Sequence, residues 1–65
     1  MKYYEIKVYT IENSEYKYYI ESEDINVARE HAKRIVLEGY WEKLSRKEVF
    51  HAPWRIVKVS IKETY

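Results

Sequence analysis

One amphipathic segment, residues 24–39, constrains the fold of this chain more than any other feature. Its sequence, DINVAREHAKRIVLEG, repeats apolar residues at the spacing of one face of an α-helix. Asp24 suits the N-cap position because its carboxylate can accept hydrogen bonds from the free N–H groups of the first turn, although Ser22 could do so two residues earlier. Gly39 is the only glycine and stands where a helix end needs a left-handed residue. The predicted apolar face comprises Ile25, Ala28, Ala32, Ile35 and Val36.

Two segments before the helix alternate between apolar and polar side chains, which is typical of half-buried strands. Residues 1–11 and 15–21 are therefore predicted strands, and a turn at residues 12–14 joins them into a hairpin. Asn13 can take the positive φ that a tight turn often needs. One face of this hairpin carries Tyr4, Ile6 and Val8 from the first strand and Tyr16, Tyr18 and Ile20 from the second.

The chain after the helix is less regular. Residues 40–46 show no clear period and predict a loop, whereas residues 47–51 predict a short strand. Ala52-Pro53 ends that strand because proline lacks the N–H group that a strand ladder needs. Residues 54–63 predict the last strand, with Val57, Val59 and Ile61 on the core face and Ile56, Lys58, Ser60 and Lys62 on the opposite face.

The order ββα(β)β predicts one α+β domain over residues 1–65, a two-layer sandwich in which a helix covers one face of a small, mainly antiparallel sheet. A chain of 65 residues can bury only a small core. We therefore expect a homo-oligomer that covers the open sheet face or a sheet edge. The expected core comprises Tyr4, Ile6, Val8, Tyr18, Ile20, Ile25, Ala28, Ala32, Ile35, Val36, Val57, Val59 and Ile61.

Eight tyrosines, two tryptophans and one phenylalanine are more rings than one small core can bury, so we expect an exposed aromatic surface and a partner. The absence of cysteine excludes disulfides and thiolate metal sites. The formal net charge of +1 argues against a protein whose main function is to bind long nucleic acid. The sequence shows no signal peptide and no membrane span, which predicts a cytoplasmic location, in the host cell if the protein is phage-encoded.

A cluster of aromatic and basic residues after the helix is the first candidate site. Trp and Arg are frequent at interface hot spots, and two tryptophans outside the periodic segments are unusual in so short a chain. These side chains could bind a protein partner or clamp an anionic aromatic ligand such as a nucleotide. Alternatively, Trp41 and Trp54 close the ends of a small core. The candidate residues are Tyr40, Trp41, Lys43, Arg46, Lys47, His51, Trp54 and Arg55.

The open sheet face is the second candidate, because aromatic rings there could stack on bases while lysines contact phosphates. Glu5 and Glu21 interrupt this surface. The same residues could also be ordinary solvent-facing strand residues with cross-strand pairing, or part of a dimer interface. The candidate residues are Tyr3, Lys7, Tyr9, Lys17, Tyr19 and Lys58, with Lys62 beside them.

Residue types that serve catalysis and metal binding occur without a useful pattern. His31 and His51 are the only histidines, and no third ligand accompanies them. The serines lack the context of an activated nucleophile, and the glutamates are spread singly. We therefore expect a protein that is not an enzyme and that holds no metal and no cofactor.

Two stretches carry a resemblance to a known group of proteins. The helix pattern D-x-x-x-A-R-x-x-A is formed by Asp24, Ala28, Arg29 and Ala32, and the later stretch V-F-H-A-P-W-R-I contains Phe50, Pro53, Arg55 and Ile56. Together with the hairpin, they resemble small uncharacterised proteins of phages and Firmicutes mobile elements, whose last strand follows a motif like Y-Y-P-P-H-R-I. Here Ala52 replaces the first proline and Trp54 replaces the usual polar residue.

The resemblance touches nearly the whole chain and implies a ββαβ architecture and a phage accessory origin, but no activity. By analogy, some small phage proteins inhibit host enzymes or sequester nucleotide signals. The sequence thus favours a small binding protein that sequesters or inhibits a protein partner or a nucleotide-type ligand through Trp41, Trp54 and Arg55. A single-stranded nucleic-acid-binding sheet and a structural subunit of a larger assembly are the alternatives.

Overall fold

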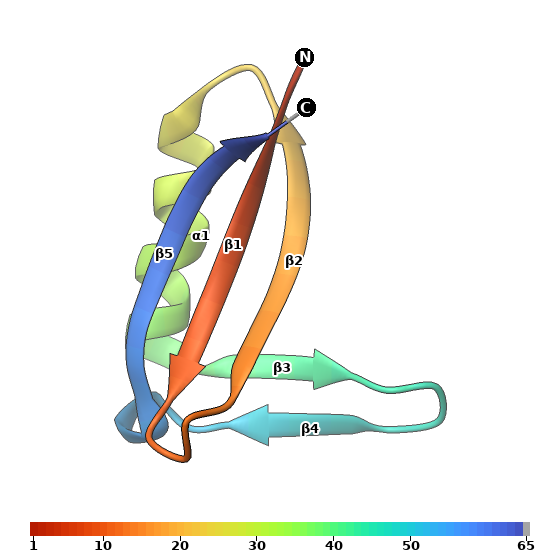
Figure 1. Cartoon of the computed structure of the whole chain (residues 1–65), viewed down its shortest axis with the longest axis vertical. Coiled ribbons are helices and arrows are strands. Elements are labelled where there is room, and N and C mark those ends of the chain that lie inside the picture. The colour runs from red at the N-terminus through yellow and green to blue at the C-terminus, as the bar shows by residue number, and fades with distance from the viewer. Residues whose placement is uncertain (65) are drawn as a thin grey trace.

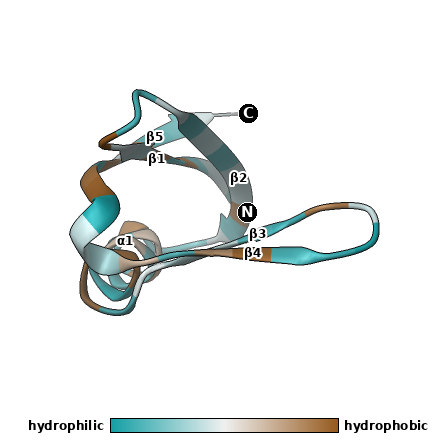
Figure 2. Ribbon diagram, turned by 90° about the horizontal axis from the view of Figure 1, so that it is seen from below, coloured by the Kyte–Doolittle hydropathy of each residue, from teal (hydrophilic) through white to brown (hydrophobic). Residues whose placement is uncertain are grey.

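The computed structural model describes residues 1–64 and contains one long helix packed on a small antiparallel sheet, the predicted two-layer α+β fold (Figure 1). Figure 2 shows that the helix and a second, two-stranded hairpin lie on the same side of the sheet. The elements in chain order are β1 (Lys2–Thr10), β2 (Glu15–Ser22), α1 (Ile25–Glu38), β3 (Tyr40–Lys43), β4 (Glu48–His51), a 3₁₀ turn η1 (Pro53–Arg55) and β5 (Ile56–Thr64).

The three-stranded sheet has the order β2-β1-β5, so β1 is its central strand. Antiparallel pairing sets Ile6 opposite Tyr18 on one side and opposite Ile61 on the other. Directly opposed residues point to the same face, so this register gathers the apolar side chains of all three strands on the face that α1 covers. Tyr4, Ile6 and Val8 are buried there, which confirms the predicted core face of the first strand.

The β1–β2 turn confirms the predicted hairpin. Asn13 has a φ of 64°, the left-handed value expected of it. The Thr10 N–H donates to the Ser14 carbonyl at 3.0 Å, and the Asn13 N–H donates to the Thr10 carbonyl at 3.1 Å. Asparagine tolerates this backbone region better than most residues, so the turn is specified locally.

Both predicted caps of α1 are confirmed. The Asp24 carboxylate accepts a hydrogen bond from the Asn26 N–H at 2.9 Å, as an N-cap does. At the other end, Gly39 has a φ of 98° and its N–H donates to the Ile35 carbonyl at 2.8 Å. Ser22 instead accepts a hydrogen bond from the Asp24 N–H at 3.1 Å, and so orders the approach to the helix rather than its first turn.

The predicted core was wrong at three positions. Ile25 and Val36 lie on an exposed flank of α1, because the sheet covers only a narrow stripe of the helix, centred on Ala28 and Ile35. Val57 is 65% exposed because the ladder between β1 and β5 is irregular at that point. There Tyr9 pairs with Lys58 but Thr10 pairs with Ile56, which leaves Val57 as the extra residue of a β-bulge. Ile56, predicted on the opposite face, therefore packs against the core.

Two further predictions after the helix need correction. Residues 40–46 were predicted as a loop, but Tyr40–Lys43 forms β3 and pairs with β4, whose position agrees with the predicted short strand. Four residues are too few to show a period by themselves, so only the pairing defines this strand. The last strand begins at Ile56 rather than Trp54, because Pro53 starts the turn η1.

Candidate functional site

The β3–β4 hairpin projects from the body of the molecule (Figure 1) and has two different faces. Tyr40 pairs with His51, and Trp41 pairs with Phe50. Because side chains alternate along a strand, the two pairs point to opposite faces. Burial agrees with this assignment. Tyr40, Glu42, Val49 and His51 are half-buried, whereas Trp41, Lys43, Glu48 and Phe50 are exposed.

The half-buried face anchors the hairpin to β2 through a group of rings. The ring of His51 lies 4.6 Å from that of Tyr16, and the ring of Tyr40 stacks on that of Tyr18 at 5.9 Å with an interplanar angle of 11°. Burial raises the pKa of Tyr18 to about 12 and also raises the pKa of Tyr40. Aromatic pairs of this kind add stability beyond their buried area.

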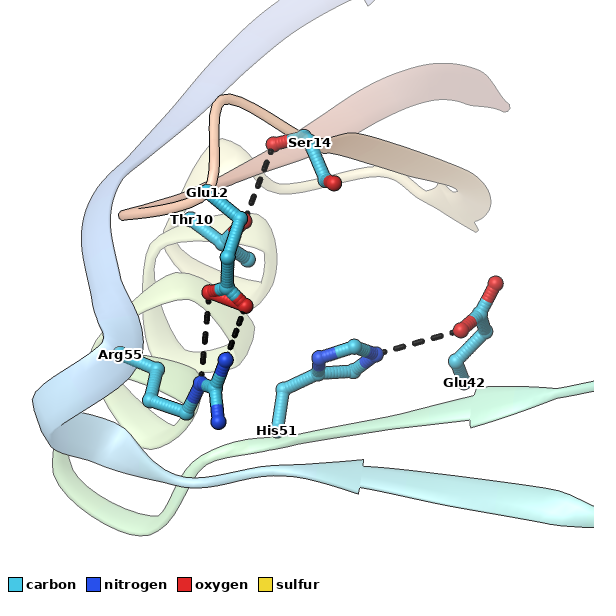
Figure 3. A network of polar contacts seen from close by, with 6 residues as sticks. All are labelled: Thr10, Glu12, Ser14, Glu42, His51 and Arg55. Carbon is cyan, nitrogen blue, oxygen red and sulfur yellow. Dashed lines mark hydrogen bonds and ion pairs between the residues drawn. The ribbon is translucent and has the colours of Figure 1, made fainter.

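His51 also makes a polar contact on this face. Its Nε2 lies 3.2 Å from Oε1 of Glu42, two side chains that point toward each other in Figure 3. The contact links β4 to β3, and the His51 ring also lies close to the rings of Tyr16 and Tyr40. His51, one of the predicted ligand-binding residues, therefore contacts both β3 and β2 on the half-buried face of the hairpin.

The exposed face of the hairpin presents an aromatic pair to solvent. The rings of Trp41 and Phe50 lie 4.8 Å apart, and these residues are 56% and 44% exposed. A Cβ at Gly39 would come within 2.8 Å of the Phe50 ring, which shows how closely this ring approaches the end of α1. The pair is therefore held between the helix end and the hairpin while one side remains open.

The structure distributes the residues of the predicted post-helix cluster over several surfaces. Tyr40 and His51 lie on the half-buried hairpin face, Trp41 and Lys43 lie on its exposed face, and Arg46 and Lys47 lie at its tip. Trp54 and Arg55 belong to η1. Within residues 1–64, Trp54 makes no ring contact with Trp41, and it is 79% exposed.

Arg55 is engaged in an ion pair that joins distant parts of the chain. Its guanidinium contacts the Glu12 carboxylate with two nitrogens, one of which, Nε, donates to Oε1 at 3.3 Å (Figure 3). This contact raises the pKa of Arg55 and lowers the pKa of Glu12. The backbone repeats the connection, because the Ile11 N–H donates to the Arg55 carbonyl at 2.9 Å. Arg55 thus ties η1 to the β1–β2 turn.

Phe50 is the functional candidate that the sequence interpretation missed. Because residues 40–46 were predicted as a loop, no strand was expected to pair with residues 47–51 and to place Trp41 beside Phe50. The available signal was the alternation in Y-W-E-K and in E-V-F-H, whose two halves match when they are paired as antiparallel strands.

The second predicted surface does gather on one face. The sheet register places Tyr3, Lys7 and Tyr9 of β1 beside Lys17 and Tyr19 of β2 and Lys58 of β5. Carboxylates form hydrogen bonds or ion pairs with several of these side chains. Glu5 accepts from the Tyr19 hydroxyl at 3.0 Å and lies 3.9 Å from the Lys7 ammonium, which Glu15 approaches to 3.3 Å. The Lys58 ammonium lies 5.5 Å from the centre of the Tyr9 ring.

Residues 1–64 contain no group of three or more His, Asp or Glu side chains arranged to hold a metal ion. Neither is any helix in this range of sufficient length and apolarity to cross a bilayer. Comparison with family models, curated proteins and solved structures finds no match for the chain.

Proposed function

We propose that this chain is a small non-enzymatic binding protein of the phage accessory type, which sequesters or inhibits a protein partner through the exposed face of the β3–β4 hairpin. The observation that carries the proposal is the aromatic pair of Trp41 and Phe50, which a rigid hairpin holds open to solvent. Such large apolar side chains are costly to leave in water and are frequent anchors of protein interfaces.

Rigidity supports this assignment. The opposite face of the hairpin is fixed to β2 by the rings of Tyr16, Tyr18, Tyr40 and His51. A preformed surface loses little conformational freedom on binding, so more of the contact energy becomes affinity. The hairpin therefore presents its aromatic pair in one arrangement, as an efficient interface anchor requires.

Charge around the aromatic pair favours an acidic partner. Lys43 lies on the same face as Trp41, and Arg46 and Lys47 follow at the tip, whereas Glu48 is the acidic residue of this face. A basic rim around an apolar centre accelerates encounter with a partner of opposite charge and disfavours basic ones.

The test is affinity capture from a host lysate followed by quantitative mass spectrometry, with the wild-type chain compared with Trp41→Ala and Phe50→Ala. We expect each variant to capture at least tenfold less of the partner, because truncation of a hot-spot side chain lowers affinity by this amount or more. Val57→Ala is the matched control, because Val57 is an exposed apolar residue away from the hairpin. Equal capture by all three variants would contradict the proposal.

Trp54→Ala maps the site more closely. If Trp54 and Trp41 formed one binding site, as the sequence predicts, Trp54→Ala would reduce capture of the partner as strongly as Trp41→Ala. We expect it to retain the partner, because η1 presents Trp54 apart from the aromatic pair. Light scattering on the same samples tests the predicted homo-oligomer, since a second copy could itself be the partner of the hairpin.

A single-stranded nucleic-acid-binding sheet is a second candidate, favoured by the shared face of Tyr3, Lys7, Tyr9, Lys17, Tyr19 and Lys58. The carboxylates of Glu5 and Glu15 compete with phosphate for Lys7, which weakens this candidate. Phosphate contacts make affinity fall steeply with salt. Oligonucleotide binding that is absent, or that does not change between low and high salt, would reject it.

A further inference from the structure

Two adjoining hollows lie along β2 and β3, and the first of them also reaches α1. The first, of about 520 Å³, is lined by Val27, His31 and Arg34 of the helix together with Tyr18, Tyr40 and Trp41. The second, of about 530 Å³, shares these three aromatic residues and adds Tyr16, Lys17 and Lys43. Both volumes are in the range of small-molecule sites, roughly 300–1,000 Å³.

The second hollow borders the edges of two strands. It is lined by three consecutive residues of β2, Tyr16 to Tyr18, and by four of β3, Tyr40 to Lys43. Consecutive side chains point to opposite faces of a strand, so a hollow that touches all of them follows the strand edge. β2 is the outermost strand of its sheet and β3 pairs only with β4, so each has one edge with unpaired backbone groups.

The second hollow combines flat apolar walls with two lysine side chains. The rings of Tyr18 and Tyr40 are nearly parallel, and Trp41 stands beside them in both hollows. Lys17 and Lys43 flank the second hollow, and within residues 1–64 neither takes part in an ion pair. Glu42, the acidic residue of that hollow, is engaged by His51 at 3.2 Å.

The geometry points to a nucleotide site in the second hollow, in which a base lies against Tyr18, Tyr40 and Trp41 and its phosphate is held between Lys17 and Lys43. Bases stack on aromatic side chains regardless of sequence, and ammonium groups bind phosphate. The unpaired backbone groups of the two strand edges supply donors and acceptors for the rim of the base. This site shares Trp41 and Lys43 with the partner-binding face, whereas Phe50 belongs to that face alone and lines neither hollow.

An NMR titration of the full chain with adenosine 5′-monophosphate tests the site, with adenosine and inorganic phosphate as partial ligands. We expect the nucleotide to shift the amide signals of residues 16–18 and 40–43 and to bind at least tenfold more tightly than either part. Shifts confined to other residues, equal binding of adenosine, or no shift at 10 mM (on the order of the weakest useful affinity) would overturn the proposal.

Lysine variants make the test specific. Lys17→Ala and Lys43→Ala should each weaken nucleotide binding by roughly threefold to tenfold, as the loss of one phosphate contact does. Lys33→Ala, an exposed lysine of α1 that lines neither hollow, is the matched control and should change affinity less than about twofold. Equal effects of all three variants would show non-specific charge attraction and overturn the site.

A short oligoadenylate distinguishes the two ligands that contain a base and a phosphate, a free nucleotide and a single strand of nucleic acid. Binding that is at least tenfold tighter than that of the mononucleotide identifies a single strand, whereas equal binding identifies a free nucleotide, and both uphold the base-plus-phosphate site. An acidic peptide that replaces the nucleotide at the same residues would instead identify a peptide groove and overturn it. Phe50→Ala should retain nucleotide binding and lose the protein partner, so the two proposals can fail separately.

Discussion

The three-stranded body and the β3–β4 hairpin contain similar aromatic and aliphatic residues but bury them to different extents. In the body, Tyr4, Ile6 and Val8 are enclosed because β1 has a strand on each side and a helix above. In the hairpin, each strand has only one neighbour, and only the face that meets β2 is covered. Position in the sheet, rather than residue type, therefore decides which rings remain available for binding.

The difference also separates stability from binding. Truncating a buried side chain of the body should lower the free energy of unfolding, whereas truncating one on the exposed hairpin face should weaken the binding of a partner. Gly39 lies at the junction of the two regions, where α1 ends and Phe50 approaches its backbone. Variants in the body, at the junction and at the surface therefore test the comparison in decreasing order of effect.

The largest effect is expected for Ile6→Ala in the central strand. Ile6 is fully buried between the sheet and the helix, so its truncation removes apolar contacts and leaves a cavity. We expect a loss of about 2–5 kcal/mol in the free energy of unfolding, measured by urea denaturation. Val57→Ala, on the exposed bulge, should change this value by less than about 0.5 kcal/mol. A similar loss in both variants would mean that the bulge does not exist in solution.

Gly39→Ala should be the next most damaging change. The φ of 98° disfavours any residue with a Cβ, and a Cβ here would lie 2.6 Å from the His51 carbonyl oxygen. We expect a loss of roughly 1–3 kcal/mol, together with a change in Trp41 fluorescence as the hairpin shifts. Trp54→Phe supplies a background in which Trp41 is the only tryptophan. Lys33→Ala, an exposed substitution in α1 that lines neither hollow beside Trp41, is the control and should leave the fluorescence unchanged.

Asp24→Ala tests the body without disturbing the hairpin. It removes the acceptor of the Asn26 N–H at the start of α1, which should cost about 1 kcal/mol in urea denaturation. Asp24→Asn keeps an acceptor and should restore most of the loss. The fluorescence of Trp41 should be the same in both variants, and a change confined to Asp24→Ala would show that the two regions are more strongly coupled than the structure indicates.

The smallest effect is expected at the exposed pair of Glu12 and Arg55. The guanidinium holds the pKa of Glu12 below its ordinary value in the folded protein. The resulting stabilisation is therefore present above the pKa of the unfolded chain and is lost as the pH falls through the lower, folded-state pKa. We expect Glu12→Gln to lower the urea midpoint slightly at pH 7 and to match the wild type in acid.

Glu23→Gln is the control for this pair, because Glu23 forms no ion pair in the part of the chain that the structure describes. Its urea midpoint should equal that of the wild type at both pH values. A difference between Glu12→Gln and the wild type that persists or grows in acid would contradict the assigned role of Arg55.

Features that depend on neighbouring residues were predictable from the sequence. The caps at Asp24 and Gly39, the positive φ of Asn13 and the alternation of β1 all follow from side-chain chemistry within a few positions. The five residues that β1 and β2 contribute to the open sheet face could also be grouped in advance, because a period of two and a two-strand hairpin fix which face each side chain takes.

Features that depend on distant pairing were decided only by the tertiary structure. The bulge at Val57 exchanges Val57 for Ile56 in the core, at the point where β5 follows η1 and begins to pair with β1. Likewise, β3 is a strand only because β4 pairs with it, and this pairing brings Phe50 to Trp41 and separates both from Trp54. The sequence alone determined the helix, the first hairpin and the presence of more aromatic residues than the core can bury. Long-range contacts decided which of these aromatic side chains are exposed to solvent, because no local preference specifies a cross-strand partner.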